Sequence, residues 1–193
     1  MRKLIITNIV SLDGFSAGPG GDVMAMPMDH AFDSHNVERL RAAETLLLGR
    51  NTYEGFKAYW PSIAGDEESD AVNREISRRN DAIEKVVVSD TLTPEQTDPW
   101  RATTRIVRRA EAHERIAELK DGDGGEILVF GSGTLWNGLL AAGLVDELHL
   151  MVGPVVLGDG TPAFTTPPAT RLRLIDTLTF DGSDNVVIRY AAS

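Results

Sequence analysis

Two turns in the sequence carry residue types that could bind phosphate. In "ILVFGSGTLWNG", the corner at residues 131–133 separates an apolar run from an amphipathic segment. In "LLLGRNTYEGF", Gly49 ends an apolar run, and Asn51 or Thr52 is suited to begin a helix. A helix N-terminus offers free N–H groups and partial positive charge, and Arg50 adds a planar fork that fits a phosphate. Each turn also has a plainer interpretation, as a tight corner or as a capped helix with a surface arginine.

The Gly-x-Gly corner matches only part of the dinucleotide-binding fingerprint. The sixth position of the G-x-G-x-x-G pattern is Trp136, where glycine or alanine is usual. The nearest acids, Asp146 and Glu147, come too early to bind a ribose. The sequence therefore favours a bound diphosphate without predicting a Rossmann fold.

Asp13, in "SLDGF", is the candidate for chemistry on a substrate. Asp-Gly is a common turn, which is the plainer interpretation. A carboxylate at the end of a strand could also bind a substrate amine or hydroxyl, or handle a proton. The four histidines are scattered and the chain has no cysteine, so we expect no metal site. The sequence also lacks the G-x-S-x-G motif of a hydrolase.

The order of apolar runs predicts the elements that position these residues. Runs rich in β-branched residues alternate with helical segments, which is typical of an α/β domain with a largely parallel sheet. The predicted strands are 3–10, 45–49, 85–89, 105–108, 126–130 and 147–158, and the predicted helical segments are 35–43, 73–80, 112–120 and 134–143. Residues 171–180 and 185–190 alternate in polarity, which predicts an antiparallel hairpin at the sheet edge with Asp181-Gly182 in its turn.

In open α/β sheets, ligands bind beyond the C-terminal ends of the strands. We therefore expect Gly49, Ser89 and the corner at residues 131–133 to gather along one edge. Residues 16–28 and 61–70 are the expected mobile loops. The first, with its exposed methionines, fits a lid or substrate loop and equally a plain crossover.

Composition limits the possible partners. The 193 residues suit a single domain spanning 1–193, and a net charge of −10 argues against non-specific nucleic-acid binding. No apolar run reaches the roughly 18 residues of a membrane span. With no cysteine, a cytoplasmic location is expected.

These pieces, in this order, resemble the dihydrofolate reductase superfamily. They are most similar to the C-terminal reductase domain of the bifunctional riboflavin-biosynthesis deaminase/reductase and its stand-alone relatives. The resemblance rests on residues 11–17, 46–56, 86–92 and 127–164. Its most specific part is "GLVDEL" followed by the pattern P-x-x-L-G-x-G-x-P-x-F.

The resemblance implies a dihydrofolate-reductase-like three-layer αβα sandwich with a mixed, mainly parallel sheet and a C-terminal antiparallel hairpin. It also implies NADPH bound along the strand edge, with NADH not excluded. The implied cofactor-binding residues are Ile9, Val10, Gly49, Arg50, Thr52, Ser89, Gly131, Ser132, Gly133, Thr134 and Leu135. The implied substrate side holds Asp13, Phe56, Gly158 and Gly160.

The chain differs from these relatives at the glycine corner, at Asp90 and in its domain content. Relatives often have a cis Gly-Gly bond at the corner where this chain has Gly131-Ser132, and a non-proline cis bond costs about 2.5–4 kcal/mol. Asp90 would oppose the 2′-phosphate of NADPH and leave Arg50 to compensate. The sequence has no counterpart of the zinc-binding deaminase domain, so we expect it not to catalyse that step.

The implied activity is that of 5-amino-6-(5-phosphoribosylamino)uracil reductase in riboflavin biosynthesis. Hydride would go to the ribose C1′, with a proton from water or Asp13. The alternatives are a reductase of a pterin or dihydrofolate, for which Asp33 is the one candidate acid, and a nucleotide-binding protein without turnover. Residues 144–157 and 172–190 hold long β-branched runs with no later helix to cover them, which predicts a homodimer.

Overall fold

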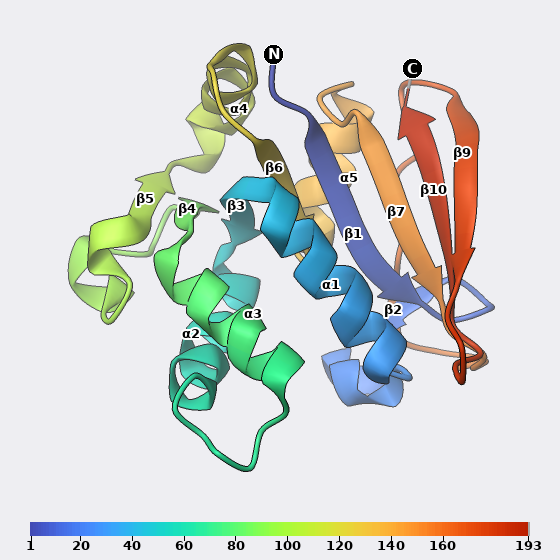
Figure 1. The fold of residues 1–193 in the computed structure, drawn as a ribbon. Coiled ribbons are helices and arrows are strands. Elements are labelled where there is room, and N and C mark those ends of the chain that lie inside the picture. Colours follow the sequence, from blue (N-terminus) through green and yellow to red (C-terminus); the bar gives the residue numbers. More distant parts are fainter. Residues whose placement is uncertain (193) are drawn as a thin grey trace.

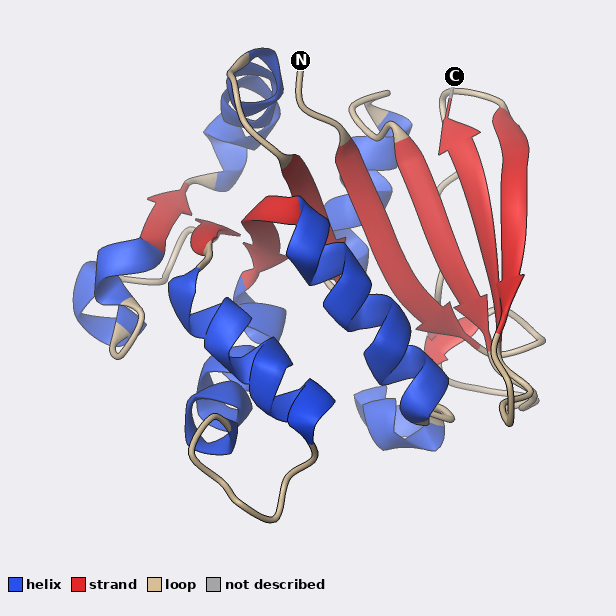
Figure 2. Cartoon of the chain, viewed as in Figure 1, coloured by secondary structure: helices blue, strands red, loops and turns tan. Residues whose placement is uncertain are grey.

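An eight-stranded mixed sheet runs through the protein, and helices cover both of its faces (Figure 1 and Figure 2). The computed structural model describes residues 1–192. The strands of the main sheet are β1 (Leu4–Val10), β3 (Ala43–Gly49), β4 (Glu84–Val88), β5 (Thr104–Val107), β6 (Glu126–Phe130), β7 (Glu147–Val152), β9 (Leu172–Thr179) and β10 (Val186–Ala192). The helices are α1 (His30–Ala42), α2 (Arg50–Ile63), α3 (Ala71–Ala82), α4 (Ala112–Asp121) and α5 (Gly133–Ala141).

The strand order is β5-β4-β3-β6-β1-β7-β10-β9. The first six strands in this order pair in parallel, whereas β10 pairs antiparallel with both β7 and β9. The predicted α/β fold, mainly parallel sheet and C-terminal hairpin are therefore confirmed.

Alternation along the strands fills two cores. Leu46 and Leu48 of β3 pack on the face covered by α1, α2 and α3, while Leu47 between them packs on the face covered by α4 and α5. All three leucines are fully buried. A strand buried on both faces reads as a continuous apolar run, which is why these strands were predictable.

The structure differs from the sequence prediction in the loops. Helix α2 begins at Arg50 and continues through Pro61, so the predicted loop at 61–70 is shorter. The predicted strand 147–158 ends at Val152. Residues 16–28 contain regular structure rather than an irregular loop. They begin in the short strand β2 (Phe15–Ala17), which pairs with β8 (Thr161–Pro162), and Met26 in this segment is buried.

Two histidines from distant parts of the chain meet in the core, where burial disfavours their protonation. The rings of His35 in α1 and His149 in β7 lie 5.9 Å apart. Within residues 1–192, His35 Nε2 and His149 Nδ1 have no hydrogen-bond partner. Burial lowers the pKa of His35 to about 3, helped by the nearby charges of His149, Arg39 and Arg189. Burial also lowers the pKa of His149, although Glu147 opposes the shift.

We expect the free energy of unfolding to fall as the pH drops from 7 to 5. An unfolded histidine binds its proton near the ordinary pKa of 6.5, whereas folded His35 stays neutral until about 3. Stability from this group is therefore present above pH 6.5 and is lost below it, by up to ~1.4 kcal/mol per pH unit. Chemical denaturation at several pH values measures the slope.

The substitution His35→Phe should flatten this slope, because it removes the group that takes up the proton. The matched control is His113→Phe, since His113 is exposed on α4. Equal slopes in the His35→Phe variant and the unmodified protein would contradict the prediction.

Candidate active site

The C-terminal ends of five adjacent parallel strands form one edge, as the sequence predicted. Strands β5, β4, β3, β6 and β1 are neighbours in that order, so Ser89, Gly49 and Gly131 follow the ends of consecutive strands. The register pairs β1 with β6 only over Leu4–Thr7, but with β7 over Ile5–Val10. The backbone of residues 8–10 therefore pairs with β7 on one side and has no strand partner on the other among the described residues.

The two predicted phosphate-binding turns are tied directly to each other. The Gly49 N–H donates to Ser132 Oγ at 3.0 Å, and the Ser132 N–H donates to Thr52 Oγ1 at 3.0 Å. Gly131 and Ser132 both have positive φ, at 51° and 53°. A Cβ on Gly131 would lie 3.4 Å from two atoms of Thr52. A side chain at residue 131 is therefore disfavoured partly because Thr52 of the neighbouring turn packs against this position.

The bond between Gly131 and Ser132 is not the cis bond that the resemblance suggested. Within the described residues, the one cis peptide joins Asp98 to Pro99. Two successive residues in the left-handed region turn the chain at this corner instead, and glycine tolerates that conformation most easily.

Both helices that start at these turns begin without a side-chain cap among the residues described. The N-cap residues are Gly49 for α2 and Ser132 for α5, and the Ser132 hydroxyl is already used by Gly49. The first N–H groups of a helix need acceptors, and an anion supplies them. At Gly133, no described heavy atom lies within 4 Å of where a Cβ would stand, which leaves space above the start of α5.

Arg50 extends from the end of β3 to the turn after β4. Its Nε donates to Glu54 at 2.8 Å, and Nη1 donates to the Thr91 hydroxyl. Ser89 is buried, and its hydroxyl accepts from the N–H groups of Thr91 and Leu92 at 3.3 and 3.0 Å. Ser89 therefore shapes the turn, while Arg50 faces it.

Arg108 and Arg109 at the end of β5 also belong to this part of the edge, and the sequence analysis missed them. Arg108 donates to the Ser89 carbonyl at 3.0 Å. The Asp90 carboxylate accepts from the Arg109 N–H at 2.9 Å and lies 3.6 Å from the Arg109 guanidinium. The rule that located Ser89 could have found both arginines, because they follow the next parallel strand.

Asp13 anchors the backbone on the other side of the site. Its carboxylate accepts from Ser11 Oγ at 2.6 Å, and from the N–H groups of Gly158 and Leu157 at 2.7 and 3.1 Å. The Ser11 hydroxyl first, and then the Gly158 N–H, lower the pKa of Asp13 to about 2. The carboxylate is therefore ionised near neutral pH and joins the turn after β1 to the loop after β7.

The two glycines predicted on the substrate side have structural reasons to be glycine. Gly158 has a φ of 72°. A Cβ on Gly160 would lie only 2.2 Å from the Ala17 carbonyl oxygen. Their backbones still border the segment that Asp13 holds.

The remaining predicted residues lie along the same edge. Phe56 is half-buried on α2, with its ring 6.0 Å from that of Phe130. Ile9 and Val10 are buried at the end of β1, and the first turn of α5 holds the exposed Thr134 and the half-buried Leu135. Asp33, in the first turn of α1, accepts from Asn73 at 3.2 Å, and its burial raises its pKa.

No group of three or more potential ligands that could hold a metal ion occurs in the part of the chain that the structure describes. None of its described helices is long and apolar enough to span a membrane.

The fold and site define a class. A mainly parallel sheet with an antiparallel C-terminal hairpin is the fold that this chain shares with dihydrofolate-reductase-like proteins. Dihydrofolate reductase from Enterococcus faecalis, complexed with NADP(H), has this fold with a TM-score of 0.61, 14% identity, and coverage of 99% of this chain and 96% of that one.

Within this class, the model of the RibD C-terminal domain matches residues 2–187, so the chain belongs to that family. A putative riboflavin biosynthesis protein from Shewanella matches with a TM-score of 0.72 and 19% identity, covering 100% of this chain and 99% of that one. The Thermotoga maritima diaminohydroxyphosphoribosylaminopyrimidine deaminase/5-amino-6-(5-phosphoribosylamino)uracil reductase matches with a TM-score of 0.65 and 12% identity, covering all of this chain and 57% of that one. The uncharacterized protein YyaP of Bacillus subtilis is 29% identical over 93% of this chain and 89% of its own length.

We expect Gly133→Val and Gly131→Val each to weaken NADPH binding at least about tenfold, or ~1.4 kcal/mol. The Gly133→Val side chain would enter the space above α5, and the Gly131→Val side chain would press on Thr52 and shift the corner. Gly131→Val should also lower stability, since its φ is positive, whereas Gly133→Val meets no described atom. Fluorescence titration with NADPH, alongside thermal unfolding, separates the two effects.

The matched control is Gly143→Val at the other end of α5. Gly143 has a φ of 70° and open space around it, so this variant carries the backbone strain without touching the site. Unchanged NADPH affinity in a folded Gly133→Val protein would contradict the predicted site.

Proposed function

We propose that the protein is an NADPH-dependent reductase of a small heterocyclic substrate, related to the ribosylamino-pyrimidine reductases of riboflavin biosynthesis. Membership of the RibD C-terminal domain family points to a pyrimidine-reductase-like activity. The observation that carries the proposal is the pair of uncapped helix starts, joined through Ser132, at one sheet edge.

In this proposal the cofactor lies along the edge. The starts of α2 and α5, with Gly49, Thr52 and the segment 131–135, would hold its phosphates. Ser89 and Arg50 would border the adenosine end, and the backbone of Ile9 and Val10 would border the nicotinamide, where β1 extends past β6. When bound, NADPH supplies the hydride, and the protein supplies position and electrostatics.

The proton is assigned to water. Asp13 is ionised and its oxygens are occupied by three donors, so it would hold the loop after β7 against the substrate. Asp33 has a raised pKa because of burial, which makes it the better acid of the two. Because this acid lies in the first turn of α1, a pterin is the alternative substrate class.

The test is a titration with NADPH and with NADH, followed by measurement of NADPH oxidation with the ribosylamino-pyrimidine and with a dihydropterin. Binding with oxidation of the cofactor supports the proposal. Tight NADPH binding without turnover on either compound would favour a nucleotide-binding protein that does no chemistry. A cytoplasmic location is part of the proposal, since NADPH is a cytoplasmic reductant.

We expect Arg50→Ala to weaken the binding of NADPH more than the binding of NADH, by about 1.5–3 kcal/mol for a lost charged hydrogen bond. The reason is that Arg50 faces the turn at Thr91, where a 2′-phosphate would lie. Asp90→Ser should tighten the binding of NADPH, because it releases the Arg109 guanidinium and removes a negative charge that would repel the 2′-phosphate.

The control is Arg105→Ala, which changes the net charge equally from an exposed position on β5. Equal losses for both cofactors in Arg50→Ala would show that Arg50 serves a shared phosphate or the fold alone.

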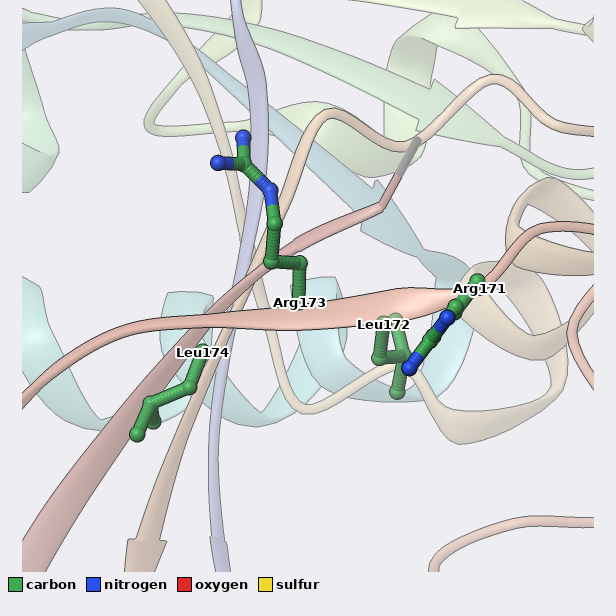
Figure 3. Close-up of a pocket in the computed structure, with 4 residues that line it drawn as sticks. All are labelled: Arg171, Leu172, Arg173 and Leu174. Atoms are coloured by element: carbon green, nitrogen blue, oxygen red, sulfur yellow. The ribbon is translucent and has the colours of Figure 1, made fainter.

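We also propose that the protein is a homodimer that uses β9. This strand is the outer strand of the sheet and carries the exposed side chains of Leu174 and Ile175 (56% and 45% exposed). The pairing of β9 with β10 shifts register between Arg189 and Tyr190. On β9 the shift falls at Leu174 and Ile175, and these two side chains lie outside the core. A hollow of about 390 Å³ lies at the beginning of the strand, lined by residues 171–174 (Figure 3). An uncovered edge of this kind favours pairing with a second chain.

We expect light scattering at micromolar concentration to give twice the chain mass of 21.0 kDa. Leu174→Lys should shift the protein toward the monomer, whereas Leu12→Lys, at an exposed position near the other end of the sheet, should not. Val187 is unsuitable for this test, although it lies on the same hairpin, because it is fully buried in the core. A single-chain mass for the unmodified protein would reject the dimer.

A further inference from the structure

The arginines of the strand edge all lie at its cofactor end. Arg50, Arg108 and Arg109 surround the turn at residues 89–92. We call the segments 11–38, 58–73 and 153–170 the substrate half, since they contain or border Asp13, Asp33, Phe56 and Gly158. These segments contain no lysine and no arginine.

Four cations lie next to the substrate half in sequence, namely Arg39, Lys57, Arg74 and Arg171. Arg39 pairs with Glu126 at 3.4 Å, and Arg171 precedes β9 and lines the hollow at the beginning of that strand. The other two are also engaged elsewhere. Lys57 donates to the Gln96 carbonyl and lies 5.9 Å from the centre of the Tyr53 ring. The Arg74 guanidinium donates to the Ser69 carbonyl.

Helix starts show the same division. In the substrate half, the Asp29 side chain accepts from the first N–H groups of α1, at Ala31 and Phe32. The Asp70 side chain accepts from Asn73 N–H at the start of α3. In contrast, α2 and α5 at the cofactor end begin without such caps in the described chain. The anion sites of the substrate half are therefore already filled by the protein's own carboxylates.

The Asp29 carboxylate is fixed in place by further donors. Ser183 Oγ donates to it at 2.6 Å and Asn185 Nδ2 at 2.9 Å. Although burial opposes ionisation, these hydrogen bonds and those from α1 lower the pKa of Asp29. An incoming phosphate could not displace this group without breaking the connection between the start of α1 and the turn at 183–185.

A substrate phosphate would carry a charge of about −1.5 to −2 at neutral pH. Proteins bind such groups with arginine, lysine or free helix N-termini, and the substrate half offers none of these within the described residues. It offers instead the ionised Asp13 and the exposed Asp159, together with the exposed apolar side chains of Leu12 and Val156 (64% and 68% exposed).

We propose that the substrate half binds a neutral or positively charged heterocycle that carries no phosphate group. This inference rests on the proposed reductase function and narrows its substrate class. It separates this chain from the Thermotoga maritima protein, whose named substrate is a phosphoribosylamino-uracil.

The test compares a matched pair of compounds, 5-amino-6-ribosylaminouracil and its 5′-phosphate, by calorimetric titration of protein saturated with NADP⁺. We expect the phosphate-free compound to bind at least about tenfold more tightly, or the phosphorylated compound to show no binding up to about 1 mM. Equal affinity, or tighter binding of the phosphorylated compound, would overturn the inference. If NADP⁺ itself does not bind, the cofactor proposal fails, and the same comparison is made on the free protein.

A charge reversal tests the cause of the preference. Asp159→Lys should raise the affinity for the phosphorylated compound several-fold relative to the affinity for the phosphate-free compound. The matched control is Asp123→Lys, at an exposed position between α4 and β6. An unchanged ratio of the two affinities in Asp159→Lys would show that charge in the substrate half does not set the preference, and would overturn the inference.

Discussion

The exchange of hydrogen bonds between Gly49, Thr52 and Ser132 is the constraint on which the candidate site depends. It can form because β6 lies beside β3 in the sheet although 83 residues separate Gly49 from Ser132. Helix α2 packs on one face of the sheet and α5 on the other, so their starts meet only at the edge. A diphosphate placed there would contact both layers of helices at once, and would satisfy N–H groups that the chain leaves without a side-chain cap.

On the proposed substrate side, residues distant in sequence contact the single segment that follows β7. Asp13 binds the N–H groups of Leu157 and Gly158, and Gly160 lies against the backbone of Ala17. Further along, Asn137 of α5 donates to the Ala163 carbonyl and accepts from the Thr165 N–H, both at 2.9 Å. Strand β1, strand β2 and helix α5 thus all fix the segment that follows β7. In the proposed site this segment would form a wall, and its position depends on the same helix that would hold the diphosphate.

How far the sequence predicted this arrangement depends on whether local pattern or long-range contact decides each feature. The continuous run Leu46-Leu47-Leu48 identified a strand buried on both faces, and strand-end residues then located Gly49 and Ser89 on one edge. The same rule applied to "RIVRR" would have added Arg108 and Arg109. Pairing of β2 with β8 joins segments about 145 residues apart and leaves no local pattern. The hairpin was predicted, but its register shift between Arg189 and Tyr190 was not, and neither was which of its apolar side chains are buried: Val187 packs in the core, whereas Leu174 is exposed.

Acidic residues also do more in this protein than keep its surface soluble. The net charge of −10 includes Asp13, Asp29, Asp70 and Asp90, and each of these accepts from at least one backbone N–H group at a turn or helix start. A backbone donor that holds a carboxylate of the same chain cannot hold a phosphate of a ligand. Helices α2, α4 and α5 start without a side-chain cap in the described chain, and of these the starts of α2 and α5 are joined to each other at the strand edge, where an anion would fit. Composition alone could not show this division, because it depends on which N–H groups the acids reach.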